Sequence, residues 1–279
     1  MRSFGLKRQT TKPNMQKRPF YPYISDRKQG QILNIELSST SKLRVLSFVR
    51  DSISHKSKFL IVTPNPEIIL EAQEDKKLAK ILNSADLALP DGVGLVLSAK
   101  ILGFPALNLI KGREMFLDLA KLANKKHWKI FLLGGRKDEA EAAAEILSRS
   151  LKGVKIAYSA GPELNQAGEP TTLKDRELEK DIVAQINNFA PQILFIGFGA
   201  PKQEKWTAKW YRKLNVGGAM VVGGTFNYIS GRASLPPKWM ENYGLEWLWR
   251  LITQPWRIVR IFKATVVFPI KVFLYKLKQ

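Results

Sequence analysis

The stretch KIFLLGGRKDEAEAAAEILSRSLKGVKIAYSAG, residues 129–161, decides the fold. It starts with a short apolar run that ends in two glycines, continues with apolar residues at helical spacing over 138–151, and closes with a second strand-like run over 154–161. A strand, a helix and a strand in this succession form a unit in which the two strands are parallel and the helix covers the sheet. The stretch therefore predicts a parallel α/β architecture.

The same alternation extends in both directions along the chain. We predict an α/β fold whose mostly parallel, Rossmann-like sheet has helices on both faces, and we assign it to residues 31–245. Ligands of such sheets bind outside the carboxyl ends of the strands. The further strand-like runs are 58–64, 87–91, 192–199 and 219–226, and the further helical patterns are 65–83, 112–126 and 173–190.

Composition narrows the class of protein. The 279 residues are 45% hydrophobic, enough for a proper core, and 45 lysines and arginines against 24 acids give a formal charge of +21. Such an excess requires an anionic partner, which leaves nucleic acid, anionic lipid and phosphate-bearing substrates. The absence of cysteine excludes disulfides, thiolate zinc sites and cysteine nucleophiles. The two histidines, His55 and His127, offer little for a metal site or a catalytic triad.

The first thirty residues differ from the middle of the chain. Residues 1–30 are basic and lack periodic apolar spacing, so we predict a flexible basic arm. A solvated tail with no binding role is the alternative. This segment has no apolar signal-peptide core, so we expect the protein in the cytoplasm.

The C-terminal segment, residues 246–279, has a different character. It interleaves aromatic residues with lysines and arginines and contains no acid after Glu246. That composition is typical of helices at a bilayer interface, so we predict a basic amphipathic helical appendage that lies on an anionic membrane surface. A helical hairpin packed on the domain is the alternative. Lys263, Pro269 and Lys271 interrupt its most apolar stretch, which is too short to span a membrane.

Polar residues and glycines follow five of the predicted strands. Because the carboxyl ends of parallel strands meet at one edge of the sheet, we expect these residues to form one site. Glycines let a backbone approach a ligand closely and helix N-termini favour phosphate, so the ligand we expect is a nucleotide. The residues are Thr63, Asn65, Asp91, Gly134, Gly135, Gly197, Gly199, Gln203, Gly223 and Gly224.

Some of these positions have structural alternatives. Asp91 lies in a Pro-Asp-Gly turn and would cap a helix that starts near Val93. Asn65 would cap a helix that starts at Pro66. The segment GFGAPKQE, residues 197–204, would be a tight strand-to-helix turn. The residue pattern alone does not decide between these roles and a role in binding.

Several motifs together point to one known family. Over residues 32–262 the chain resembles the WecG/TagA/CpsF glycosyltransferases, glycosyltransferase family 26, in the order and spacing of these motifs. They are TPNPEII (63–69), LPDGVGLVLSAKILG (89–103), FLLGGRKDEAEAAAEIL (131–147), GFGAPKQEKW (197–206), VGGTFNYISG (222–231) and PPKWMENYGLEWLWRLITQPWRIVR (236–260).

The resemblance implies transfer of a sugar from a UDP-sugar to a lipid-linked sugar. The best-known members move N-acetylmannosamine to undecaprenyl-diphosphate-linked N-acetylglucosamine in teichoic acid or surface polysaccharide synthesis, with inversion and without a metal. We therefore expect no metal and no cofactor, and a peripheral protein on the inner face of the cell membrane. The chain fits metal independence, since no Asp-x-Asp pair follows a predicted strand.

The resemblance also assigns roles to residues. A carboxylate must take the acceptor proton as its oxygen attacks the anomeric carbon, and Asp91 stands at the position of this base. A departing diphosphate needs cations where no metal binds, and three C-terminal arginines match such positions; binding of lipid headgroups only is their alternative. Docking of that segment on the membrane would complete the site. The arginines are Arg250, Arg257 and Arg260, and the matching polar residues are Thr63, Asn65 and Gln203.

Departures from the family pattern leave the donor open. Asn227 and Gln254 replace acids that are common in the family, so transfer of another hexose or of a uronic acid in exopolysaccharide assembly is the alternative function. We expect no nucleic acid partner, because the sequence has no helix-turn-helix, zinc module or ribonucleoprotein aromatic pair. A nicotinamide-dependent dehydrogenase is disfavoured because GFGAPKQ lacks the last glycine of the required motif. The sequence leaves a homo-oligomer open.

Overall fold

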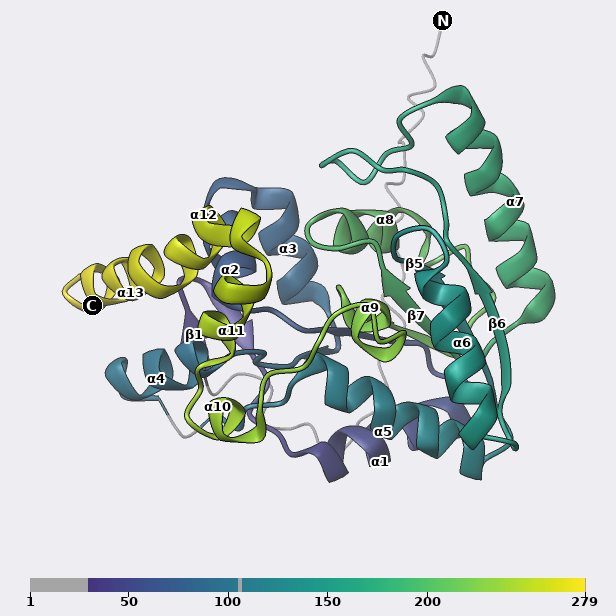
Figure 1. Ribbon diagram of the computed structural model, residues 1–279, viewed down its shortest axis with the longest axis horizontal. Helices are drawn as coiled ribbons and strands as arrows, with labels where there is room; N and C mark the ends of the chain where they lie inside the picture. Colours follow the sequence, from purple (N-terminus) through teal and green to yellow (C-terminus); the bar gives the residue numbers. More distant parts are fainter. Residues whose placement is uncertain (1–29, 105–106, 279) are drawn as a thin grey trace, which may run out of the picture.

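The computed structural model describes residues 30–104 and 107–278. Its centre is a single sheet of six parallel strands (Figure 1). This confirms the predicted α/β fold. The basic arm expected over residues 1–30 lies outside the described residues, except for Gly30. The strands lie in the order β4 (Leu87–Ala88), β3 (Phe59–Val62), β8 (Gly218–Val221), β7 (Ile193–Gly197), β5 (Lys129–Gly134) and β6 (Lys155–Ser159).

Helices cover both faces of this sheet because successive strand residues alternate between two hydrophobic cores. In β5, Ile130 and Leu132 pack into one core, whereas Phe131 and Leu133 pack into the other. The first core lies under α1 (Lys42–Ser54), α5 (Gly112–Lys125) and α6 (Glu139–Ser150). The second lies under α2 (Pro66–Glu74), α3 (Lys76–Ser84), α7 (Leu173–Phe189) and α8 (Lys202–Trp210). The sheet is therefore buried on both sides, as parallel sheets are.

The single helix expected over 65–83 is wrong, because the structure has two helices there. Asp75 has an extended backbone between α2 and α3, with φ −115° and ψ 91°. Its Oδ1 accepts a hydrogen bond from the Leu78 N–H at 2.9 Å, which caps α3. An aspartate that bonds to the backbone ahead of it starts a new helix and does not continue the old one.

The strands all end before the predicted limits, and two of them end three or more residues early. The strand expected over 87–91 ends at Ala88, two residues before Pro90, which has no N–H to add to a sheet ladder. The strand expected over 219–226 ends at Val221, before Gly223 and Gly224. α9 (Thr225–Ile229) starts directly after these two glycines. Both changes lengthen the loops at the carboxyl edge of the sheet, where the candidate site lies.

A small hairpin and one further helix complete the edge of the sheet beyond β4. The antiparallel strands β1 (Gly30–Ile32) and β2 (Ile35–Leu37) are joined through Leu33 and Asn34, whose φ values are 48° and 63°. Two central residues with positive φ are the geometry of a tight hairpin turn. α4 (Val93–Ile101) follows Asp91 and packs against β1.

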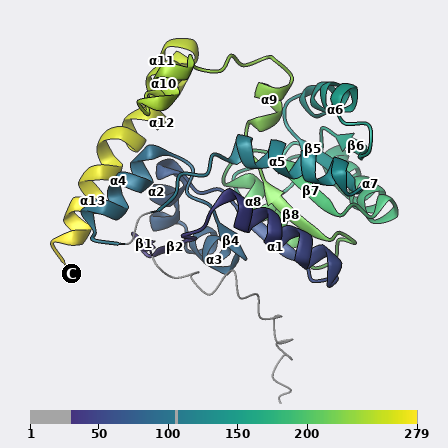
Figure 2. The ribbon, with the colours of Figure 1, turned by 90° about the horizontal axis from the view of Figure 1, so that it is seen from below.

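The C-terminal segment forms a chain of short helices along one side of the domain, past α4 (Figure 2). Phe268 and Val272 pack into the core between α2 and α4, whereas Phe262, Ile270 and Phe273 are 54–55% exposed. No described helix is long and apolar enough to cross a membrane. The elements of this segment are α11 (Glu246–Thr253), the 3-10 helix η2 (Pro255–Arg257), α12 (Ile258–Phe262), the π-helical η3 (Lys263–Val267) and α13 (Phe268–Lys276), and α10 (Lys238–Asn242) precedes it.

Candidate functional site

Two adjoining cavities lie at the carboxyl edge of the sheet. The first, which we call the Asp91 cavity, has a volume of ≈160 Å³ and includes residues of the loops after β3 and β4, of α5 and of the C-terminal helices. The second, the glycine-loop cavity, has a volume of ≈970 Å³ and is lined by the loops after β5, β6, β7 and β8. The two share a boundary formed by Gly199, Gly223, Gly224 and Arg257. A ligand with two parts can therefore occupy both.

Asp91 lines the Asp91 cavity, held there by its backbone and its side chain. Its N–H donates to the Pro64 carbonyl at 2.9 Å, and its Oδ2 accepts from the Gly112 N–H at 3.2 Å, at the start of α5. Within the described chain no side chain caps α4, whose first flanking residue is Gly92 with φ 132°. The capping alternative for Asp91 is therefore wrong, and the carboxylate faces the cavity.

The surroundings of Asp91 favour its protonated form more than water does. Burial raises the pKa of Asp91 above its usual value, and the charge of Glu246 adds to this. The Arg250 guanidinium opposes the rise most strongly, followed by the hydrogen bond from Gly112. A carboxylate with a raised pKa is a stronger base than an exposed aspartate, which suits proton abstraction near neutral pH.

Gly112 allows the start of α5 to approach Asp91 and Thr63 closely. A Cβ at this position would lie 3.2 Å from Asp91 Oδ2 and 3.2 Å from Thr63 Cγ2. The Thr63 hydroxyl donates to the Val221 carbonyl at 3.4 Å, so it also ties the loop after β3 to the end of β8. The helix N-terminus therefore presents its positive end to the carboxylate.

Asn65 has the capping role that the sequence left open. Its Oδ1 accepts from the Ile68 N–H at 2.9 Å, and Pro66 occupies the first position of α2. The residue also lines the Asp91 cavity. The cap fixes the direction of the side chain, so the amide is held at the cavity wall.

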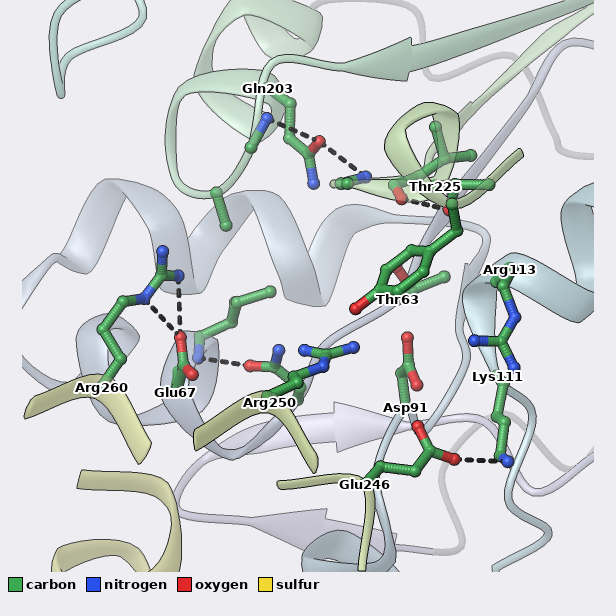
Figure 3. A pocket seen from close by; sticks show the side chains of 18 of the residues that line it. Thr63, Glu67, Asp91, Lys111, Arg113, Gln203, Thr225, Glu246, Arg250 and Arg260 are labelled. Atoms are coloured by element: carbon green, nitrogen blue, oxygen red, sulfur yellow. Dashed lines mark hydrogen bonds and ion pairs between the residues drawn. The ribbon is translucent and has the colours of Figure 1, made fainter. Parts of the chain in front are cut away.

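Gln203 connects the loops after β7 and β8. Its Oε1 accepts from the N–H of Gly199 at 3.2 Å and from the N–H of Gly223 at 3.0 Å (Figure 3). Its Nε2 donates to Glu204 at 2.9 Å. The side chain is 2% exposed. At Gly199, φ is 81° and nothing lies within 4 Å of where a Cβ would be, so this backbone faces open space. Gln203 thus sets the boundary between the two cavities.

The remaining glycines do not share one role. Gly135 and Gly197 line the glycine-loop cavity. Gly134 lines neither cavity; a Cβ there would lie 3.0 Å from the backbone of Gly197 and from Phe198. Of the two neighbouring glycines at the end of β5, Gly135 therefore faces the cavity, whereas Gly134 allows close packing against the end of β7.

The three predicted arginines converge on the Asp91 cavity from α11, η2 and α12. Burial lowers the pKa of Arg257, and the neighbouring charges of Arg250 and Arg260 lower it further. Arg260 also pairs with Glu67 of α2, with its Nε and Nη2 at 2.8 and 2.7 Å from Glu67 Oε2. Cations that crowd one another in a partly dry cavity are a favourable setting for a polyanion.

The sequence did not identify several charged and aromatic residues of this cavity. Lys111 directly precedes α5, Arg113 lies in its first turn, and both pair with acids of α10 and α11. Tyr228 of α9 places its ring near the guanidinium of Arg113 and that of Arg250, with 5.5 and 5.9 Å from guanidinium carbon to ring centroid. The one local signal was the segment KGRE, residues 111–114, which places two cations at a predicted helix start.

Comparisons with known proteins agree with this architecture. The model of the Glycosyl transferase WecG/TagA/CpsF family matches residues 30–279. The N-acetylglucosaminyldiphosphoundecaprenol N-acetyl-beta-D-mannosaminyltransferase of Bacillus subtilis (strain 168) is 33% identical over 210 residues, which cover 75% of this chain and 77% of that protein. The protein of the same name from Staphylococcus aureus (strain NCTC 8325 / PS 47) is 27% identical over 250 residues, 89% of this chain and 91% of that protein.

Proposed function

The chain belongs to the WecG/TagA/CpsF family of glycosyltransferases, and from this premise we propose that it transfers N-acetylmannosamine from its UDP-sugar to undecaprenyl-diphosphate-linked N-acetylglucosamine. One observation carries the proposal: a half-buried carboxylate, Asp91, shares a cavity with three arginines that converge from the C-terminal helices. An acidic base opposite a cluster of cations is what glycosyl transfer with an anionic leaving group requires. The names of the relatives supply the sugar and the lipid acceptor.

The chemistry uses these groups in a single displacement. Asp91 takes the proton of the acceptor hydroxyl while that oxygen forms a bond to the anomeric carbon of the donor sugar. The bond from that carbon to the UDP oxygen breaks on the opposite face, and its electron pair leaves with the diphosphate, so the configuration inverts. Arg250, Arg257 and Arg260 stabilise the charge that develops on the departing diphosphate, which is the task a divalent metal has in other enzymes.

The two cavities suggest how the donor is divided. The glycine-loop cavity, at ≈970 Å³ against ≈160 Å³, offers the larger space for the nucleoside. The diphosphate then lies at the shared boundary, beside Arg257 and the glycine backbone, and the sugar lies in the Asp91 cavity next to Thr63 and Asn65. This arrangement brings the anomeric carbon to the carboxylate and needs no metal ion or cofactor.

The C-terminal helices suggest how the lipid acceptor arrives. Their outer surface exposes large apolar side chains, among them Trp256 at 68% and Leu277 at 68%, next to lysines at positions 263, 271, 276 and 278. A face that combines apolar and basic side chains binds an anionic membrane surface as a peripheral protein. The same helices carry the three arginines, so the lipid-linked diphosphate would meet the site where the protein meets the membrane.

An acceptor-dependent UDP-release assay tests the proposal. The full-length protein is incubated with undecaprenyl-diphosphate-linked N-acetylglucosamine and, in turn, UDP-N-acetylmannosamine, UDP-N-acetylglucosamine, UDP-glucose and UDP-glucuronic acid. We expect release with the first donor, and a loss of about 10²- to 10⁴-fold in Asp91→Asn with an unchanged melting temperature. Asp181→Asn, an exposed carboxyl on α7, is the matched control.

The results of this assay separate the donor, the base and the reaction. Preference for another hexose or for the uronic acid would replace the proposed donor by the alternative of exopolysaccharide assembly. Full activity of Asp91→Asn would remove Asp91 as the base. No acceptor-dependent release with any donor would contradict the proposed reaction.

A further inference from the structure

Two basic residues at the first turn of α5 bind the acids of the C-terminal helices. Lys111 pairs with Glu246 of α11 and lies 3.5 Å from Glu241 of α10, and Arg113 Nη2 lies 2.7 Å from Glu241 Oε1. The Lys111 and Arg113 side chains are only 16% and 15% exposed. Between these two residues lies Gly112, whose N–H bonds to the base carboxylate. One helical turn therefore contacts the base and the C-terminal helices together.

Arg250 lies close to this attachment and lines the same cavity. It follows Glu246 by four residues in α11, so the two side chains lie on the same face of that helix. On the other side, the Tyr228 ring lies 5.9 Å from the Arg250 guanidinium and 5.5 Å from that of Arg113. In Figure 3 the Lys111–Glu246 pair lies below Asp91, and Arg250 lies beside Asp91.

We propose that Lys111 and Arg113 are positioning residues, which hold Arg250 next to Asp91 through Glu246, Glu241 and Tyr228. The proposal rests on the proposed function, in which Asp91 is the base and Arg250 stabilises the leaving diphosphate. Lys111 and Arg113 line the same cavity, but their charges are matched by three acids, Glu114, Glu241 and Glu246. They therefore fix geometry and do not act as additional diphosphate ligands.

The pairing with acids stabilises the charged form of Lys111. Burial would lower the pKa of Lys111, but the pairing with Glu246 and Glu241 outweighs burial and raises the pKa above its usual value. Lys111 is thus an ammonium at neutral pH. Removal of one partner from so little-exposed a pair leaves the other charge poorly compensated, and the helix that carries it shifts.

Replacement of Glu246 distinguishes positioning from direct electrostatics, because the two predict opposite shifts in the pKa of Asp91. Its charge raises the pKa of Asp91 directly, so direct electrostatics predicts that Glu246→Gln lowers that pKa. Positioning predicts the reverse, because Glu246→Gln releases Arg250, whose charge lowers the pKa of Asp91 more than Glu246 raises it. A rise in the pKa of Asp91 after an acid has been removed has no explanation in direct electrostatics.

The experiment compares Glu246→Gln and Lys111→Met with the conservative Lys111→Arg. The matched control is Glu74→Gln, because Glu74 joins α2 to Lys271 of α13 in an exposed pair at 3.8 Å, far from the base. We measure kcat, KM and the acid limb of kcat/KM against pH, and we titrate Asp91 by carbon NMR with labelled aspartate. Melting temperatures of all variants establish that each is folded.

Positioning predicts a fall in kcat of roughly tenfold to a hundredfold in Glu246→Gln and Lys111→Met, with a smaller change in KM. It also predicts an upward shift of the acid limb and of the Asp91 titration in both variants, near-normal values in Lys111→Arg, and unchanged values in Glu74→Gln. A downward shift in Glu246→Gln, or unchanged kcat in both variants, would overturn it. If wild type transfers no sugar, the proposed function fails by itself, and the NMR titration still decides the positioning of Arg250.

Discussion

Replacement of Glu204 by glutamine should change how stability depends on pH. Glu204 lies in the first turn of α8 and is 1% exposed; its Oε1 accepts from Gln203 at 2.9 Å, and its Oε2 has no hydrogen-bond partner among the described residues. Burial raises the pKa of Glu204 to about 7, with a further contribution from Glu71, while Gln203 and Lys205 oppose the rise. The folded protein therefore keeps a proton on Glu204 at a pH where the unfolded chain has lost it.

The size of the effect follows from the gap between the two pKa values. The pKa is 4.5 for an unperturbed glutamate and about 7 in the folded protein. Each unit of this gap corresponds to about 1.4 kcal/mol, so ionisation of Glu204 removes about 3 kcal/mol of folding free energy. The loss accumulates as the pH rises from 4.5 to about 7 and does not grow further above that range. For a protein of this size the melting temperature moves by about 5 °C.

Thermal melts of wild type and Glu204→Gln between pH 5 and pH 8 measure this effect. Glutamine can accept the same hydrogen bond from Gln203 and carries no charge, so the variant should gain about 5 °C relative to wild type as the pH rises across that range. Glu177→Gln, an exposed carboxyl on α7, is the control and should stay parallel to wild type. A constant difference between wild type and Glu204→Gln at all pH values would refute a proton on Glu204 in the folded protein.

Two further predictions concern the walls of the Asp91 cavity. Gly112→Ala should lower kcat by roughly tenfold with little change in melting temperature, because the new Cβ would lie 3.2 Å from Asp91 Oδ2 and push the base away; full kcat in this variant would contradict the close approach. Asn65→Ala should cost about 1 kcal/mol of stability, measured by denaturant unfolding, and should also raise KM for the donor. Asn65→Asp should restore the stability, because aspartate also caps, but not the KM; full recovery of both would leave Asn65 with the cap alone.

The sheet could be predicted because its strands and helices have local signatures. The run over 130–133 is apolar throughout because a central parallel strand is buried on both faces, and the helices between the strands keep a periodic apolar face. The break at Asp75 could not be predicted from that periodicity, because the apolar spacing continues across it. It depends on one side chain that bonds to the backbone of Leu78.

The site residues that could be predicted are those that lie close in sequence to a predicted strand. Thr63, Asn65 and Asp91 lie within three residues of a strand end, and the topology brings those strand ends together. Gly134 and Gly135 are neighbours in sequence, yet only Gly135 lines a cavity, because the backbone of the next strand covers Gly134. A sequence pattern cannot distinguish them, since both have positive φ and follow the same run.

The first turn of α5 shows why a motif-based reading of this chain is incomplete. The proposed base, Asp91, and Arg250 are 159 residues apart in the numbering of the chain, and each belongs to its own recognisable motif. Their relative position depends on Gly112, which bonds to the base, and on Lys111, which pairs with the helix that carries Arg250. Neither contact has a local signature, because each partner lies on a different element. A motif therefore specifies which groups react, whereas the distance between those groups is set by residues outside the motifs.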